Sequence, residues 1–557
     1  MEYLVIAVLA VGLLLVKGYY DVVKYKATLR QKLWEQFGTV SEEEYTEEKL
    51  KHLKSYFEAV RRPAYDVDDI TWNDLELEEL YMVLNRTVCA VGAEYLYAML
   101  RQPEFDKTEL AERERLIRFF QTEEEKRIDI QQALYQIGKN SRTSVYACMD
   151  YMKKIRRESG VLHYICFIAF FAALVSAFVV PTVGVFATIA VATFNIITYM
   201  KRRSEMEMYL STVTYVIRLL YASEDLTKLD IPEISVYVER MKSLNRNFAT
   251  FKRNFWIIGS RKPTGDMMEL LVSYFRMLLH IDLIKFNSML KVYDKHEEEL
   301  KELYKTAGYL DALQAAASFR ALLGEDGYCV PELAEGTVPV YEAEELYHPL
   351  LNNPVKNTIG ADKSVLLTGS NASGKSTFLK SVAIGALLAQ TIHTVPAKSY
   401  KGSYFQILSS MALRDNMQGN ESYFIVEIKS LKRIYEAAKA PVCTLCFVDE
   451  VLRGTNTVER IAASREVLHG LATGGRTICF AATHDIELTY LLETVCDNYH
   501  FEETVTDDAV NFDYILHEGR ATSRNAIKLL RMLGYPEEII TKAEASAEHF
   551  LKTGEWQ

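Results

Sequence analysis

The sequence lacks the regular cysteine spacing that a disulfide framework would need. Its eight cysteines are scattered over 557 residues, which indicates a reducing compartment. Cys443 and Cys446 form a C-x-x-C pair, but no second pair completes a four-ligand metal site, so we expect both to be buried thiols. No linker rich in glycine or proline separates residues 205–323 into smaller pieces.

A surplus of positive charge is also missing. The chain has 64 basic and 75 acidic residues, and its net charge of -11 argues against a surface that coats nucleic acid broadly. A local basic patch is still compatible with DNA contact. With 49% apolar residues, the chain is too apolar for disorder and too long for a single core, so we expect three or four folded units.

One long stretch has no charge at all. Residues 161–200 contain no Asp, Glu, Lys or Arg, and Pro181-Thr182-Val183-Gly184 divides them, which predicts two membrane-spanning helices joined by a tight turn. Basic residues flank the stretch on both sides: Lys153, Lys154, Arg156, Arg157, Lys201, Arg202 and Arg203. The positive-inside rule therefore places both ends in the cytoplasm. A buried helical hairpin of a soluble protein is the alternative.

Residues 3–16 form another uncharged run, and basic residues follow it. No basic residue precedes the run and no clear cleavage site follows it, so we expect residues 1–20 to be an uncleaved N-terminal transmembrane anchor. A signal peptide is the alternative. The following basic residues place the C-terminal side of the anchor in the cytoplasm. The sequence thus predicts a multi-pass membrane protein with about three spans.

The remaining part of the first 330 residues has helical periodicity. We expect a helical linker over residues 21–66 and a helical core and lever region over residues 67–330, with long helices such as 282–304. The segment 240–262 alternates basic and aromatic residues, which is compatible with binding phosphates and bases or with a solvated or membrane-facing helix. After Gly324, short apolar runs alternate with helical stretches, which predicts an α/β domain over residues 331–557.

A phosphate-binding pattern follows the strand-like run 364–368. The next residues satisfy G-x-x-x-x-G-K-[ST], in which glycines let backbone N–H groups surround phosphates. Lys375 would neutralise phosphate oxygens and the Ser376 hydroxyl would ligate Mg²⁺. The predicted ATP-binding residues are Gly369, Ser370, Asn371, Ala372, Ser373, Gly374, Lys375, Ser376 and Thr377.

Two further predicted strands end in residues that hydrolysis needs. The run 444–448 precedes Asp449, a predicted ligand of Mg²⁺ together with Ser376, and Glu450, which would orient and polarise the attacking water. The run 477–482 leads to His484, which would reach the γ-phosphate as a sensor. The predicted catalytic residues are Lys375, Glu450 and His484.

In order and spacing, these motifs resemble those of the MutS family of DNA mismatch-repair ATPases. Residues 449–457 are similar to its metal motif, 482–484 to its His switch, and 420–428 to its Ser-x-Phe-x-x-Glu signature. The resemblance implies a homodimer in which Ser422 faces the ATP of the other subunit, with dimerising helices over 523–545. It also implies the fold class: an α/β P-loop ATPase domain, MutS-like or ABC-like, after an all-α core and lever region with an inserted transmembrane hairpin.

The sequence departs from the family in two ways, and two hypotheses about function therefore stay open. The family's mismatch-recognition domain has no counterpart, and the hairpin interrupts the helical core where the family places its DNA clamp. The first hypothesis is a membrane-anchored ATPase that uses ATP and Mg²⁺ and binds mismatched, branched or distorted DNA. The second is a membrane-tethered switch or scaffold whose levers bind a protein partner without DNA. An ABC transporter is disfavoured because no Leu-Ser-Gly-Gly-Gln stretch lies between Lys375 and Asp449.

Overall fold

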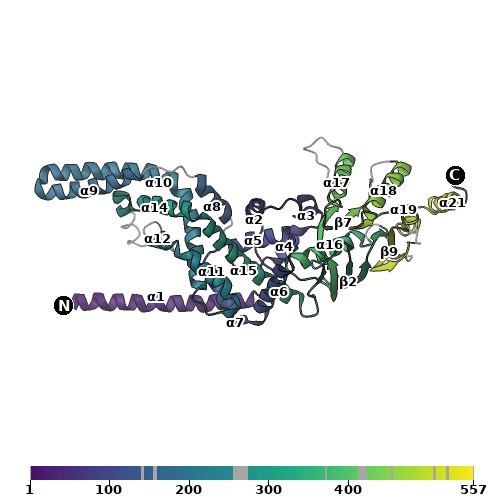
Figure 1. The fold of residues 1–557 in the computed structure, drawn as a ribbon, viewed down its shortest axis with the longest axis horizontal. Coiled ribbons are helices and arrows are strands. Elements are labelled where there is room, and N and C mark those ends of the chain that lie inside the picture. Colours follow the sequence, from purple (N-terminus) through teal and green to yellow (C-terminus); the bar gives the residue numbers. More distant parts are fainter. Residues whose placement is uncertain are drawn as a thin grey trace. The chain divides into compact units, whose positions relative to one another are not determined.

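The computed structural model describes residues 2–139, 144–154, 160–254, 274–370, 373–411, 423–452, 456–505, 510–521 and 526–555. The chain folds into two compact units, and each unit is assembled from three stretches of sequence (Figure 1). The first unit comprises residues 1–61, 84–98 and 115–319. The second comprises residues 62–83, 99–114 and 320–557.

The first unit is built from helices, and its described residues contain no strand. Three of the helices, α5, α6 and α15, also contribute residues to the second unit. The helices are α1 (Glu2–Glu35), α2 (Glu47–Ala59), α5 (Ala90–Arg101), α6 (Lys107–Thr122), α7 (Glu124–Tyr135), α8 (Val145–Lys154), α9 (Val161–Val179), α10 (Pro181–Leu226), η1 (Pro232–Ile234), α11 (Ser235–Arg246), α12 (Ala249–Lys252), α14 (Ile281–Lys295) and α15 (Glu297–Leu323).

Buried carboxylates fasten the helices of the first unit to one another. Asp311 of α15 accepts hydrogen bonds from the backbone N–H groups of Val88 (2.9 Å) and Cys89 (3.0 Å), just before α5 begins. The approach is so close that a Cβ at Gly92 would lie 2.0 Å from an Asp311 oxygen, so only glycine fits there. Distant side chains therefore satisfy N–H groups near the start of this helix.

Glu94 fastens α8 in a similar way. Its carboxylate accepts hydrogen bonds from the Val145 N–H (2.7 Å), the Ser144 hydroxyl (2.8 Å) and the Tyr304 hydroxyl (2.7 Å). These donors favour the charged carboxylate, but complete burial opposes it more strongly and raises the pKa of Glu94 to about 7. The start of α8 is thus held by a group that titrates near neutral pH.

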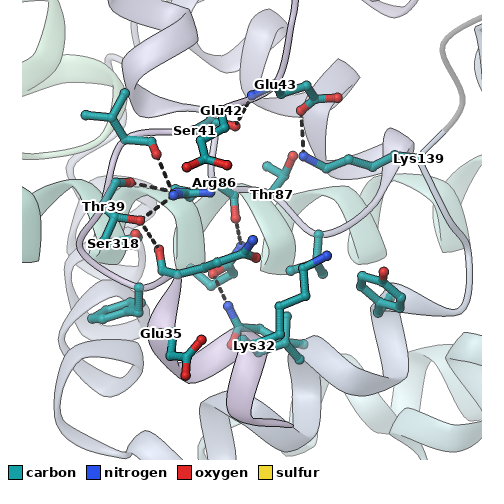
Figure 2. A pocket seen from close by; sticks show the side chains of 18 of the residues that line it. Lys32, Glu35, Thr39, Ser41, Glu42, Glu43, Arg86, Thr87, Lys139 and Ser318 are labelled. Atoms are coloured by element: carbon teal, nitrogen blue, oxygen red, sulfur yellow. Dashed lines mark hydrogen bonds and ion pairs between the residues drawn. The ribbon is translucent and has the colours of Figure 1, made fainter. Parts of the chain in front are cut away.

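The segment between α1 and α2, residues 36–46, is called the strap here. It borders a cavity of about 680 Å³ in the first unit (Figure 2). Arg86 reaches the strap and donates hydrogen bonds to the carbonyls of Thr39 (2.6 Å) and Val40 (2.5 Å). Glu43, which also lies in the strap, pairs with Lys139 at 2.7 Å, as Figure 2 shows. The cavity thus combines basic and acidic groups, and the strap ties α1 to the helical core.

Helices α9 and α10 form an antiparallel hairpin (Figure 1). The turn lies at Val180, one residue earlier than the sequence predicts, because Pro181 starts α10 at a position where its missing N–H costs nothing. The helices pack so closely that a Cβ at Gly184 would lie 2.2 Å from the Ala177 nitrogen. Gly184 therefore permits the contact next to the turn.

The hairpin exposes its apolar side chains. Val161–Val179 and Pro181–Arg203 contain stretches of 18 residues with mean hydropathies of 2.3 and 1.8. Only 17% of each stretch is buried. By length and composition, both helices are able to cross a membrane. A core helix of a soluble protein would be mostly buried instead.

The predicted helix 282–304 is interrupted in the structure. Helix α14 ends at Lys295 and α15 begins at Glu297, with His296 between them. The His296 N–H donates to the carbonyls of Val292 and Tyr293, both at 3.1 Å, and closes α14. The apolar periodicity continues across the break, so the sequence pattern did not reveal it.

Of the two alternatives for residues 240–262, base stacking is contradicted for the described residues 240–254. Phe248 and Phe251 are fully buried, so they pack in the core of the unit. Two of the basic residues lie in ion pairs: Arg240 with Glu302 (2.9 Å) and Lys252 with Glu224 (2.6 Å). Phe255 and Trp256 lie outside the described residues.

The second unit is an α/β fold with two sheets. A four-stranded sheet has the order β1-β5-β2-β3, and a six-stranded sheet has the order β10-β9-β4-β8-β7-β6. The strands are β1 (Glu332–Ala334), β2 (Tyr341–Leu346), β3 (Asn357–Ala361), β4 (Ser364–Thr368), β5 (Ser399–Ser403), β6 (Phe405–Ser410), β7 (Cys443–Asp449), β8 (Thr477–Ala482), β9 (Cys496–Val505) and β10 (Val510–Glu518). The helices are α3 (Asp69–Asp74), α4 (Leu77–Leu84), α16 (Lys375–Thr391), α17 (Tyr423–Ala437), α18 (Thr457–Ala472), α19 (Ile486–Leu491), α20 (Ala526–Met532) and α21 (Glu537–Thr553).

The larger sheet is parallel except at β10, and its central strands are buried on both faces. The three strands that the motif analysis predicts are confirmed as β4, β7 and β8. The helical region ends at Leu323, and the first strand begins at Glu332, where the sequence changes character. The prediction of a helical part followed by an α/β part is therefore confirmed.

Residues from the first fifth of the chain also belong to the second unit. Asp74, at the end of α3, accepts hydrogen bonds from the Ser409 hydroxyl (2.6 Å) and the Met411 N–H (2.9 Å) at the end of β6. Both the side chain of Asp74 and that of Ser409 are buried. Helix α3 is thus fastened to the edge strand of the larger sheet.

Candidate functional site

Three adjacent strand ends bring the predicted site residues together. Strand β8 pairs in parallel with β4 on one side and β7 on the other, and Ala482 lies opposite both Leu367 and Asp449. The carboxyl ends of parallel strands meet at one edge, where ligands bind in open α/β sheets. The loop after β4, the carboxylates at the end of β7 and the histidine after β8 therefore share this edge.

The glycines of the loop after β4 adopt conformations that other residues rarely reach. Gly369 has φ +146° and Gly374 has φ +104°, and Gly374 leads directly into α16. A Cβ at Gly374 would also lie 3.1 Å from the ring of Tyr514. The loop thereby directs the N-terminus of α16, with its free N–H groups, toward the site. Asn371 and Ala372 lie outside the described residues.

Lys375 is buried at the start of α16, and its ammonium group points back into the loop. The ammonium donates hydrogen bonds to the carbonyls of Gly369 and Ser370, both at 2.7 Å. The Ser373 hydroxyl is buried too and has no hydrogen-bond partner among the described residues. A buried hydroxyl without a partner costs free energy, and a phosphate oxygen would satisfy it.

Ser376 and Asp449 meet at the mouth of the loop. The Ser376 hydroxyl donates a hydrogen bond of 2.6 Å to the Asp449 carboxylate. Mg²⁺ prefers oxygen ligands of these two kinds, usually together with phosphate oxygens and water. The pair therefore fits the predicted metal-binding role.

Glu450 follows Asp449 in a left-handed conformation (φ +54°) that is uncommon for residues other than glycine. Its N–H donates to the carbonyl of Ala482 (2.9 Å), and its carboxylate lies 3.0 Å from the His484 imidazole. Strained backbone of this kind is concentrated at functional sites. The next turn is fixed as well, because the Leu452 N–H donates to the carboxylate of Glu427.

The turn that carries His484 is fixed by an ion pair. Arg460 of α18 donates hydrogen bonds to both oxygens of Asp485, at 2.9 and 2.5 Å. Such a two-point contact restrains the preceding residue, His484. No motif marked Arg460, although Asp485 directly after the predicted sensor was a signal for it.

A cavity of about 560 Å³ opens beside these groups, within the size range of small-molecule sites. Residues of the predicted site that line it are Ser370, Gly374, Lys375, Ser376, Thr377, Asp449 and Glu450. The other lining residues are Leu346, His348, Leu351, Asn352, Asn353, Pro354, Val355, Asn357, Phe378, Ser381, Phe501 and Tyr514.

Part of the lining of this cavity comes from the segment between β2 and β3. His348 is buried there, and burial together with the nearby Lys380 lowers its pKa to about 4. Asn357 donates to the carbonyl of Tyr514 (3.0 Å) and accepts from the Leu516 N–H (2.8 Å), which joins the two sheets. No motif marked Asn357, since its role depends on contacts far apart in sequence.

Two other predictions concern residues near the site. Cys443 and Cys446 are buried and unbridged, as expected for core thiols. Ser422, the predicted contact to the other subunit, lies outside the described residues.

The second unit matches known proteins. Residues 365–551 match the family MutS domain V. The C-terminal part of the chain is therefore similar to the MutS family. The DNA mismatch repair protein MutS of Aquifex pyrophilus is 33% identical over 268 residues, which is 44% of this chain and 30% of that protein. The DNA mismatch repair protein MutS 2 of Halobacterium salinarum is 30% identical over 272 residues, 47% of this chain and 31% of that protein.

The match to MutS proteins is partial in both directions. MutS of Clostridium kluyveri is 27% identical over 273 residues, 47% of this chain and 31% of that protein. The chain thus spans about a third of the length of the curated relatives it matches.

Proposed function

We propose that this chain is a membrane-anchored MutS-family ATPase that hydrolyses ATP to ADP and phosphate. The observation that carries the proposal is the arrangement at the end of the larger sheet. The Ser376–Asp449 pair and the Glu450–His484 pair lie on the lining of one cavity or directly beside it, next to Lys375. These are the groups that P-loop ATPases use for phosphoryl transfer.

Each residue of the proposed site has one role. Lys375 would exchange its two loop carbonyls for phosphate oxygens, while Ser376 and Asp449 would hold Mg²⁺. When bound, the metal neutralises charge on the phosphates. Glu450 would accept a hydrogen bond from the attacking water and orient it, and His484 would keep the Glu450 carboxylate in place at 3.0 Å.

We further propose a homodimer through the ATPase domain, with Ser422 of one subunit facing ATP in the other. The support is the resemblance of residues 420–428 to the family signature. In the structure, Glu427 of that motif contacts the turn after Glu450. Ligand binding at such a shared site would couple ATP to the geometry of the dimer.

The membrane location is supported by the exposed apolar hairpin. Outside a bilayer, most of the side chains in two helices with mean hydropathies of 2.3 and 1.8 would face water. With residues 1–20 as a further anchor, the proposal is a multi-pass protein of about three spans with its ATPase domain in the cytoplasm.

The substrate of the ATP-driven cycle has two candidates. The relatives are DNA mismatch repair proteins, which favours mismatched, branched or distorted DNA. Burial of Phe248 and Phe251 removes the described basic-aromatic segment as a base-stacking surface and favours the alternative, a protein partner at the levers.

The test is ATP turnover by the full chain in lipid nanodiscs, alone and with homoduplex, mismatched and four-way-junction DNA. A salt series belongs to it because phosphate contacts weaken as salt increases. A salt-sensitive change with one DNA form would support DNA as the substrate. Turnover that no DNA changes would favour the protein partner, and absence of Mg²⁺-dependent turnover would contradict the ATPase itself.

A further inference from the structure

The polar side chains inside the apolar hairpin fall into two groups. Most hydroxyl groups bond to their own helix: Ser176 to Ala173, Thr188 to Gly184 and Thr193 to Ile189, all at 2.7 to 2.8 Å between oxygens. Such bonds need no neighbouring element.

Asn195 of α10 is the contrasting case. Its side-chain amide is fully buried and donates hydrogen bonds to the carbonyls of Cys166 in α9 (3.1 Å) and Leu278 (2.7 Å). The backbone carbonyl of Asn195 lies 2.9 Å from the imidazole of His280. Asn195 therefore joins both helices of the hairpin to residues 278–280.

Two further contacts hold the same segment. The imidazole of His280 lies 3.0 Å from that of His163 in α9, and both are buried. The carboxylate of Asp282 accepts hydrogen bonds from Tyr199 (2.7 Å) and Arg203 (2.8 Å) of α10. The segment that leads into α14 is thus docked on the hairpin by polar contacts along its length.

The depth of this contact in the proposed bilayer follows from the position of Asn195 in α10. Asn195 is 14 residues beyond Pro181. It therefore lies about 21 Å along the helix from the turn at 1.5 Å per residue. If the turn sits at the far boundary of a hydrocarbon layer about 30 Å thick, Asn195 lies inside that layer. Leu278, which it contacts, lies at the same depth.

The contact also has a physical reason in lipid. Residues 274–279 are helical, and the last carbonyls of a helix have no partner within it. Inside a bilayer no water is present to satisfy them, so a side chain must do so. The amide of Asn195 supplies that donor to Leu278.

We infer that residues 274–280 enter the cytoplasmic leaflet beside the hairpin and form a further surface that contacts lipid. Tyr274 and Phe275 are 53% and 58% exposed, so in this placement their side chains would face lipid. Arg276 is buried in the protein, so its charge is not presented to lipid. This inference rests on the proposed membrane location.

The experiment places an environment-sensitive fluorescent amino acid at Phe275 of the full chain in nanodiscs made with brominated lipids. The same probe at Phe186, near the hairpin turn, reports insertion of the hairpin, and at Val236 of α11, 74% exposed, it is the control outside lipid. We expect quenching at positions 275 and 186 and none at 236.

The outcomes separate the inference from the proposal on which it rests. Quenching at 186 without quenching at 275 would overturn the inference and leave the membrane location intact. Absence of quenching at both would overturn the membrane location together with the inference.

A matched pair of variants tests the docking contact. Asn195→Leu removes the donor to Leu278, so we expect quenching at 275 to be lost while quenching at 186 stays. Thr193→Leu removes a hydroxyl that bonds only to its own helix, and should leave both signals unchanged. Equal quenching at 275 in the two variants would contradict the role of Asn195.

Discussion

The larger sheet of the second unit and the hairpin of the first place their polar groups in opposite ways. In the sheet, the residues Cys443–Val448 of β7 are buried, and the polar groups that matter lie just beyond the strand ends. In the hairpin, apolar side chains such as Phe186 and Ile189 are exposed, while His163 and Asn195 are buried. The comparison teaches that the two regions suit different solvents: water around the sheet and, for the hairpin, the lipid of the proposed membrane location.

The largest effect is expected at the strand ends of the sheet. Glu450→Gln keeps the shape of the side chain but removes the negative charge that orients water. ATP hydrolysis should then slow by on the order of 10²-fold or more, with ATP binding retained. Steady-state phosphate release measures the first, and nucleotide binding by the purified chain measures the second. Glu459→Gln, an exposed carboxylate on α18, is the control, and equal loss in both variants would remove Glu450 from its role.

A charge on the hairpin should have the next largest effect. Ile189→Arg places a cation near the middle of the apolar span, which costs about 2.5–3.5 kcal/mol on insertion scales. We expect less of the chain in the carbonate-resistant membrane fraction. Val236→Arg, at another exposed position of the first unit outside the hairpin, should leave that fraction unchanged. If both variants partition like the wild type, the hairpin does not lie in lipid.

The pH response of α8 tests the helical unit that supports the hairpin. Burial raises the pKa of Glu94 from 4.5 to about 7, so its neutral form stabilises the fold. That stability is fully present below pH 4.5 and is lost as the pH rises through 7, by on the order of 3 kcal/mol. Hydrogen exchange of the α8 amides, corrected for intrinsic rates, should show falling protection over this window. Glu94→Gln should make the profile flat, and a pH dependence that persists in this variant would contradict the assignment.

A smaller effect is expected for His484→Ala. This change removes the group that holds Glu450 but leaves the carboxylate itself, so turnover should fall by on the order of tenfold, as for other residues that orient a functional group. His469→Ala, at the far end of α18, is a control for loss of an imidazole. A loss as large as that of Glu450→Gln would mean that His484 takes part in the chemistry directly.

Much of the site could be predicted from the sequence because its residues follow strands in short motifs. Lys375, Ser376, Asp449, Glu450 and His484 are named by local patterns, and parallel strand pairing brings them to one edge. The contacts that orient them could not be predicted. Arg460 and Asn357 act on residues 25 and more than 150 positions away, and no local pattern records such a pairing.

The hairpin shows the same division between local and distant information. The uncharged run 161–200 predicts two helices, and the structure has them, with the turn moved by the position of Pro181. The docking of residues 278–280 on Asn195 could not be predicted, because it joins residues 83 positions apart in the sequence. The break at His296 was missed for a different reason, since the apolar periodicity runs through it.

The central claim is that one chain joins a MutS-like ATP site to a bilayer. The most direct test is flotation of the purified full chain with liposomes on a density gradient, with Mg²⁺-dependent ATPase activity measured in every fraction. The account predicts that wild-type activity floats with the lipid, and that Ile189→Arg moves part of the activity, with undiminished specific rate, to the bottom of the gradient. Wild-type activity that stays at the bottom, or floating protein without Mg²⁺-dependent activity, would contradict it.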